Sequence, residues 1–243
     1  MAARGDATGA YEVLAPWVEE HPEDVEAKST LAVVAAQNGR LDEAEELLEG
    51  LTGDDPRLAL LGADIALGRG EARVAILRLA EHRLDHPAVL DREFKRILGQ
   101  AYVEIGQPGE ALEVLGSVEG DPLLAHTRSR ALFQSGRMDE AVAELEPFAA
   151  QIRGFGLEGA PASQRFLMAD ILIDYARGLV ATGRAEEAVS VLEPNVSSMA
   201  SRRAWKILAQ ALVAVGRGGE AGAALSRGQA QTSREPRLPE EEN

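Results

Sequence analysis

Two histidines are the strongest candidates for metal chemistry in this sequence. His82 and His86 are four residues apart, which puts both on one face of a helix, beside Glu81 and Asp85. Two imidazoles at this spacing can chelate a divalent metal, but no HExxH glutamate or remote third ligand accompanies them. We therefore expect an exposed helix end, where cations lie favourably near the negative pole, and no metal site.

No other pattern in the chain supports catalysis or a cofactor. Gly216-x-Gly218-x-x-Ala221 has the letters of a dinucleotide fingerprint, but that motif needs a preceding strand, and here both flanks have helical periodicity. The chain has no cysteine, which excludes thiolate zinc sites and cysteine nucleophiles. Its four histidines offer no serine–histidine–aspartate arrangement. We predict that the protein is not an enzyme and that it has no catalytic residue and no cofactor.

Composition favours a helical protein with protein partners. The 243 residues are 45% hydrophobic and only 4% aromatic, so the apolar volume comes from alanine, leucine and valine, which form helices well. The net charge is −15, and such a surface repels the phosphates of nucleic acid. No signal-peptide pattern and no apolar run of about 20 residues is present, so we expect no membrane span and a cytoplasmic location.

A three-residue pattern recurs along the chain and defines a repeat. It is glycine, four residues, alanine, three residues and leucine, and its seven copies begin at Gly5, Gly39, Gly70, Gly106, Gly136, Gly183 and Gly216. About half a copy would be expected by chance. The steps between the glycines run from 30 to 47 residues. Repeats of this length are typical of solenoids.

Each unit is predicted to be a hairpin of two helices, A and B. An apolar-periodic segment leads to the glycine, which we expect to end helix A with a positive φ. Helix B follows after a short turn, with acidic residues near its positive N-terminal end. Seven residues before each later glycine stands a small residue, which lets the two helices approach closely. These small residues are Ala32, Ala63, Gly99, Ser129, Ala176 and Ala209.

The pattern resembles the tetratricopeptide repeat, a family of 34-residue helix–turn–helix units. The third full copy matches best, with Leu98-Gly99, Tyr102, Gly106, Ala111 and Leu115 in the family's positions. The resemblance covers about residues 1–229. Gly62 and Arg128 depart from it, because the family prefers a large apolar residue at their position. The resemblance implies an all-α, right-handed superhelical solenoid of antiparallel helix–turn–helix repeats.

The organisation along the chain follows from the repeat spacing. Residues 1–24 are predicted to be a lone helix B that serves as an N-terminal cap or lacks an upstream partner. Four repeats follow in 25–152, and two more in 165–229. The 47-residue step contains an insertion, predicted to be a loop at 153–164 because it is rich in glycine, proline and serine. Residues 230–243 lose the apolar period and are predicted to be a flexible tail.

In the family that this chain resembles, helix A lines a concave groove that binds partner segments. Carrying those positions over gives a balanced set of six basic and six acidic residues, Asp64 and Asp174 among the acidic ones. Donors at equivalent positions of successive repeats could bond a peptide backbone or a carboxylate, and apolar neighbours could form anchoring pockets. The same residues could equally be ordinary exposed helix residues paired across repeats. The predicted partner-binding residues are Arg57, Leu61, Arg96, Ile97, Gln100, Val103, Arg130, Phe133, Arg177, Lys206 and Gln210.

The resulting hypothesis is a non-enzymatic adaptor that holds a peptide or helix of another protein in this groove. The lysine and asparagine clamp by which some family members bind chaperone C-termini is not formed by the groove residues in either register. Two alternatives remain open. The chain could be the repeat region of a larger protein with an upstream thioredoxin-like or transferase domain. It could also be a structural element that assembles with copies of itself.

Overall fold

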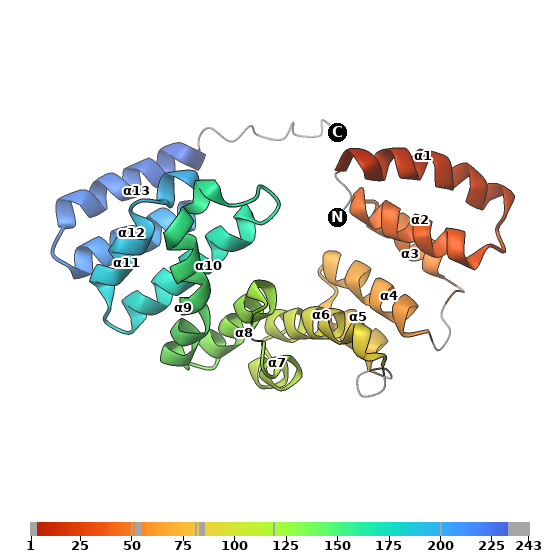
Figure 1. The fold of residues 1–243 in the computed structure, drawn as a ribbon, viewed down its shortest axis with the longest axis horizontal. Helices are drawn as coiled ribbons and strands as arrows, with labels where there is room; N and C mark the ends of the chain where they lie inside the picture. The colour runs from red at the N-terminus through yellow and green to blue at the C-terminus, as the bar shows by residue number, and fades with distance from the viewer. Residues whose placement is uncertain are drawn as a thin grey trace, which may run out of the picture. The chain divides into compact units, whose positions relative to one another are not determined.

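The fold is known from a computed structural model, which describes residues 4–49, 51, 55–80, 82, 86–118, 120–199 and 201–232. Within these ranges there are thirteen α-helices, three short 3₁₀ helices and no strand (Figure 1). No helix there is long and apolar enough to cross a membrane. The prediction of an all-α chain of helix–turn–helix repeats is confirmed.

Helices alternate between the A and B positions of the hairpins. The A helices are α2 (Val25–Gln37), α4 (Pro56–Gly68), α6 (Asp91–Glu104), α8 (Pro122–Gln134), α10 (Arg165–Ala181) and α12 (Arg202–Ala214). The B helices are α1 (Arg4–Glu20), α3 (Leu41–Leu48), α5 (Ala72–Leu79), α7 (Pro108–Leu115), α9 (Met138–Phe155), α11 (Ala185–Leu192) and α13 (Gly218–Thr232). The 3₁₀ helices are Ala88–Leu90, Leu157–Gly159 and Val196–Ser198.

The repeat glycine ends each A helix as the pattern predicts. All six glycines between paired helices have φ between 73° and 80°. In each turn the residue after the glycine donates its backbone N–H to the carbonyl five residues earlier, as Arg40 does to Ala35 at 2.9 Å. This is the Schellman arrangement, which satisfies carbonyls that the helix end leaves free. Glycine is required there because side chains disfavour positive φ.

Small residues allow the helices of one hairpin to pack closely. The six residues that precede the turn glycines by seven positions are all buried. At Gly99 an added Cβ would lie 2.8 Å from a side-chain carbon of Leu115, so α6 and α7 touch along this line. The alanines of the B helices, such as Ala111, are likewise buried. The repeat pattern therefore encodes the contact between the helices directly.

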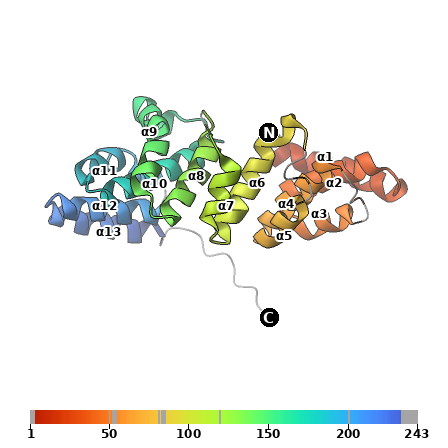
Figure 2. The same cartoon turned by 90° about the horizontal axis from the view of Figure 1, so that it is seen from below.

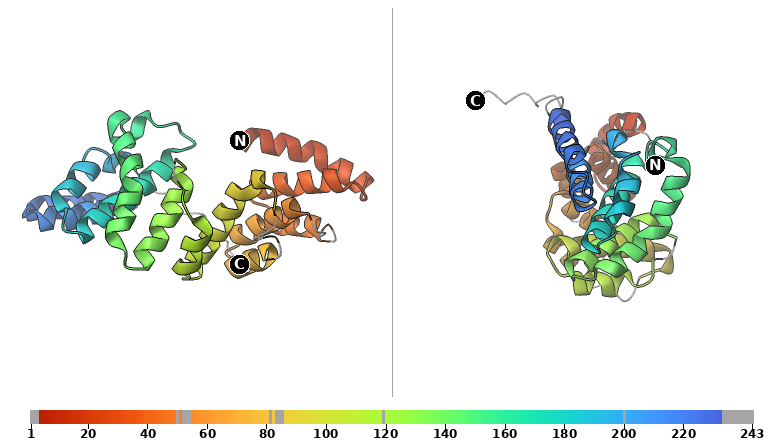
Figure 3. Two further views of the ribbon diagram at one scale, coloured as in Figure 1. Left: turned by 60° about the horizontal axis from the view of Figure 1, so that its bottom comes forward. Right: turned by 90° about the vertical axis from the view of Figure 1, so that its left-hand side faces the viewer.

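The chain divides into two compact units, residues 1–116 and 117–243. In unit 1, α1 packs against α2, and α2, α4 and α6 contact one another in succession. In unit 2, α8, α10 and α12 do the same, and α12 and α13 lie side by side in Figure 2. Figure 3 shows α1 lying along α2, where the Asn38 side chain donates to the Ala7 carbonyl at 3.1 Å.

The segment that the sequence assigns to a loop is more ordered than expected. α9 continues to Phe155, a 3₁₀ helix spans Leu157–Gly159, and the side chain of Leu157 is only 1% exposed. The Leu157 N–H donates to the side-chain oxygen of buried Asn195 at 3.2 Å. The insertion thus packs into the core of unit 2. In the predicted tail, α13 continues to Thr232, and residues 233–243 lie outside the described residues.

Candidate functional site: pockets on the A helices

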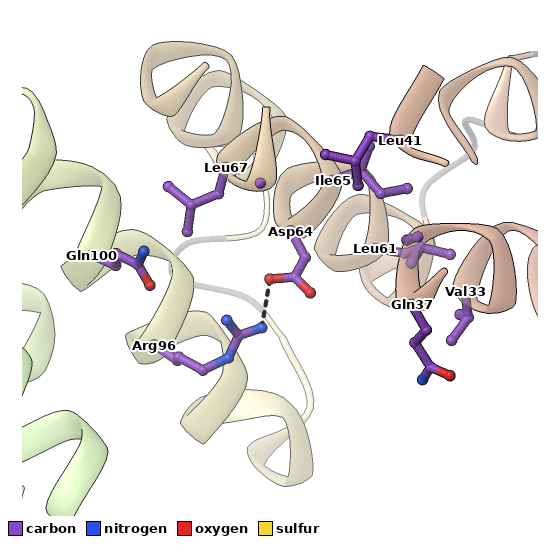
Figure 4. A pocket seen from close by; sticks show the side chains of 11 residues that line it. Val33, Gln37, Leu41, Leu61, Asp64, Ile65, Leu67, Arg96 and Gln100 are labelled. Atoms are coloured by element: carbon purple, nitrogen blue, oxygen red, sulfur yellow. Dashed lines mark hydrogen bonds and ion pairs between the residues drawn. The ribbon is translucent and has the colours of Figure 1, made fainter. Parts of the chain in front are cut away.

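Three successive A helices of unit 1 share one pocket, which we call the unit 1 pocket. Its volume is about 420 Å³. Figure 4 shows that it is surrounded by side chains of all three helices: Val33 and Gln37 of α2, Leu61 and Asp64 of α4, and Arg96 and Gln100 of α6. Because α2, α4 and α6 contact one another in order, residues at the equivalent helical position come to lie in one row. The rest of the lining includes the apolar side chains of Leu41, Ile65 and Leu67.

Ion pairs neutralise the charged members of this pocket. Arg96 bonds Asp64 at 2.8 Å and Glu93 at 2.7 Å. Burial acts to lower the pKa of Arg96, but the bonds to these two carboxylates raise it above its usual range. The Gln100 amide donates to Glu104 at 3.0 Å. The unit 1 pocket therefore combines apolar side chains with amides and a fully paired arginine.

A second pocket, the unit 2 pocket, lies where α8, α10 and α12 meet. It has a volume of about 370 Å³ and is lined by Arg130, Phe133, Gln134, Asp174, Arg177 and Arg203. The α10 glycine Gly178 lets the Phe133 ring approach, since a Cβ there would lie 3.0 Å from the ring. The Arg177 guanidinium stacks on the same ring, 4.2 Å from its centre. This stack fixes one cationic group at the pocket.

The carboxylate of Asp174 is buried at the unit 2 pocket and pairs with three side chains around it. Its side chain is 1% exposed and pairs with Arg203, with Arg177 at 3.4 Å and with His126 at 3.0 Å. Burial acts to raise the pKa of the Asp174 carboxyl. The His126 hydrogen bond and the charges of Arg177 and Arg203 outweigh burial and hold that pKa below its usual range.

Positive charge exceeds negative charge in this pocket. Arg177 and Arg203 share the single carboxylate of Asp174, and Arg130 has no carboxylate partner among the described residues. The pKa of Arg177 is lowered chiefly by burial, and the positive charges of Arg203 and Arg130 add to this effect. The unit 2 pocket therefore has an excess of cationic donors, in contrast to the unit 1 pocket.

The eleven predicted groove residues fall into three groups. Six line the two pockets: Leu61, Arg96 and Gln100 in unit 1, and Arg130, Phe133 and Arg177 in unit 2. Three are exposed on their A helices and line neither pocket: Arg57, Lys206 and Gln210. The remaining two, Ile97 and Val103, are each 1% exposed.

The burial of Ile97 and Val103 corrects their predicted role. Both lie on the packed side of α6, which contacts α4, α5 and α7. A partner cannot reach either side chain in this structure. The apolar contacts available in unit 1 come instead from Val33, 37% exposed, and from the partly buried Leu61.

Sequence reasoning placed Asp174 in the groove but missed its role as a buried anchor. Its spacing of three residues from Arg177 indicates a pair on one helix, whereas the contacts with His126 and Arg203 require knowledge of helix packing. For the two histidines, the His86 ring donates a hydrogen bond from Nδ1 to the His82 carbonyl at 2.9 Å and stacks on Phe94. The described residues contain no group of three side chains that could hold a metal ion.

The fold and the two pockets define a helical repeat protein with ligand-sized hollows on its A helices. Sequence models of the tetratricopeptide repeat match residues 1–65 and 169–194. The chain therefore contains tetratricopeptide repeats in these two segments. The comparison with curated proteins found no match.

The comparison with solved structures gave matches at low sequence identity. A chain of the APC/C hetero-tetramer Cut9–Hcn1 matches with a TM-score of 0.72 and 17% identity over 95% of this chain. This chain covers only 44% of that one, so it spans less than half the length of this structural relative. MamA of MSR-1 matches with a TM-score of 0.43 and 16% identity, over 87% of this chain and 98% of that one. A Podosopora anserina protein described as a kinesin light chain with TPR-like repeats matches with a TM-score of 0.49 and 26% identity, over 90% and 100%.

Proposed function

We propose that this chain is a non-enzymatic interaction scaffold that holds a peptide or helix of a partner protein along its A helices. Proteins of the tetratricopeptide repeat family commonly serve as protein–protein interaction scaffolds. The observation that carries the proposal is the unit 1 pocket, because three successive A helices contribute to one hollow at equivalent positions. A bound segment would therefore meet side chains from three repeats at once.

The chemistry of the unit 1 pocket suits a peptide. Peptide-binding sites combine apolar contacts for side chains with a few polar groups that fix orientation. Val33 and Leu61 supply apolar contact, and the amides of Gln37 and Gln100 can bond a peptide backbone. Arg96 is held by Asp64 and Glu93, so it contributes a fixed edge of the pocket.

The proposal can be tested by selecting ligands for the full chain from a library of random 12-residue peptides. Affinities of the selected peptides are then measured by fluorescence polarisation for the wild type and for Val33→Glu. We expect the substitution to weaken binding by tenfold or more, because it puts a charge on the apolar wall of the unit 1 pocket.

Val74→Glu is the matched control. Val74 is 36% exposed, against 37% for Val33, but it lies on the B helix α5. We expect this variant to bind the selected peptides as the wild type does. If no peptide is selected, or if both variants bind unchanged, the A helices do not form the proposed binding surface of unit 1.

A further inference from the structure

The geometry points to acidic side chains as the ligand of the unit 2 pocket: we propose that it binds a partner segment carrying at least two aspartate or glutamate carboxylates. The inference rests on the proposed function and names the chemistry of the segment at this pocket. It is carried by an excess of arginine that nothing in the described part of unit 2 compensates.

The first argument is the balance of charge. Three guanidinium groups line the pocket, from Arg130, Arg177 and Arg203, against one carboxylate, that of Asp174. These four lining groups together have a net charge of about +2. Asp174 is 1% exposed and already binds both Arg177 and Arg203, so it cannot also neutralise Arg130. Two added carboxylates would balance the cluster.

The second argument is preorganisation. Arg177 is held by the Phe133 ring on one side and by Asp174 on the other, while Arg203 is held by Asp174. The two side chains nevertheless remain 41% and 47% exposed, so their outer N–H groups can reach a ligand. Guanidinium groups fixed in this way lose little entropy when they bind a carboxylate with two parallel hydrogen bonds.

The third argument concerns the size and the distribution of donors. The pocket measures about 370 Å³, and its donors come from three different helices, with Arg130 on α8, Arg177 on α10 and Arg203 on α12. Donors spread over three helices suit two acidic side chains and the backbone between them better than one compact anion. Nucleic acid is disfavoured as the source of the negative charge, because the chain as a whole has a net charge of −15.

The test compares selections from the random 12-residue library on the full wild-type chain and on Arg130→Glu. Arg130 is chosen because it has no ion-pair partner in the described part of the chain, so its replacement breaks no ion pair there. We expect wild-type peptides to be enriched in aspartate and glutamate. They should bind Arg130→Glu at least tenfold more weakly, and the same loss should follow when their acidic residues are replaced by the matching amides.

Arg202→Glu is the control of equal charge change in the same unit. Arg202 is exposed on α12, next to Arg203, and does not line the pocket. We expect it to alter affinity by less than twofold. Circular dichroism of each variant checks that the helices are intact, and Arg130→Gln replaces Arg130→Glu if the latter does not fold.

The outcomes separate this inference from the proposed function. The selected peptides could lack acidic enrichment, bind Arg130→Glu normally and lose affinity only for Val33→Glu. That result would overturn the inference of an acidic ligand and leave the proposed scaffold function standing. A library that yields no ligand would overturn both. A chain truncated after Thr232 provides one further outcome. If this chain selects acidic peptides and the full chain does not, the pocket is reassigned to the chain's own Glu240, Glu241 and Glu242. That result would overturn the assignment to a partner.

Discussion

At the scale of single residues, Asp174 is the group on which the unit 2 pocket depends most. A buried carboxylate is costly unless it is paired and hydrogen-bonded, and Asp174 has partners on α8, α10 and α12. One side chain therefore joins three successive A helices and positions two arginines. Removing its charge should affect both stability and the pocket.

We predict that Asp174→Asn lowers the free energy of unfolding at pH 7 by about 3 kcal/mol, the size expected for breaking a buried ion pair by removing one partner. The pKa of Asp174 is depressed in the folded chain, so its stabilisation is present above its unfolded value and is lost as pH falls through the folded value. The difference between wild type and variant should therefore shrink below about pH 4. Urea unfolding at pH 7 and pH 3 measures both effects.

Asp170→Asn provides the comparison on the same helix. Asp170 lies one turn before Asp174 and is exposed, so its replacement should change stability by less than about 0.5 kcal/mol. Equal losses in the two variants would show that the ion pairs of Asp174 add nothing to the stability of unit 2.

At the scale of helices, glycines on two A helices of unit 1 have different neighbours. A Cβ at Gly62 would lie 2.3 Å from the guanidinium end of Arg78, a flexible group that pairs with Glu45. A Cβ at Gly99 would lie 2.9 Å from the branching carbon of Leu115, which is buried. The first contact can be relieved by moving a side chain, whereas the second requires the helices to separate.

We predict that Gly99→Ala destabilises the protein by about 1–3 kcal/mol through overpacking. Gly62→Ala should change stability by less than about 1 kcal/mol, because the gain in helix propensity offsets the displacement of Arg78. Urea unfolding of the two variants, in parallel, gives the comparison. A larger loss for Gly62→Ala would mean that the Arg78–Glu45 pair supports the hairpin more than the packing at Gly99 does.

The contrast between Gly99 and Gly62 also shows how far the sequence predicts this fold. The turn glycines and the small residues before them act within one hairpin, so a local pattern predicts them. At Gly62 and Arg128, charged groups occupy the space of the apolar side chain in the family pattern. Arg78, which pairs with Glu45, lies against Gly62, and Arg128 itself pairs with Glu144. Such pairs bring together residues from different helices, and no local spacing predicts them.

Burial was the main property that sequence reasoning could not assign. Ile97 and Val103 occupy groove positions in the repeat, but the packing of α6 covers them. Leu157 lies in a segment with the composition of a loop, yet its backbone bonds Asn195, 38 residues away. In both cases the deciding contact is with another helix or a distant residue. Leu61, Gln100 and Phe133 were assigned to the groove by the same reasoning and do line the pockets, while their role in binding stays a prediction.

At the scale of the whole molecule, the unit 2 pocket is a local exception to the charge of the chain. The sequence has 25 basic and 40 acidic residues, whereas the pocket has three arginines and one aspartate. An acidic ligand is therefore repelled by the molecule at a distance and attracted only near the pocket. These two forces act over different lengths, so salt should separate them.

We predict that the affinity for acidic peptides first rises and then falls with salt concentration. Between about 0.01 M and 0.1 M salt the Debye length drops from about 30 Å to about 10 Å, which screens the repulsion by the whole chain but spares contacts of a few ångströms. Toward 1 M it reaches about 3 Å, and the arginine–carboxylate contacts weaken as well. Fluorescence polarisation at four salt concentrations measures the curve, with the amide version of the peptide as the uncharged control. A steady fall from the lowest salt concentration would show that the pocket dominates the field around the molecule even at long range.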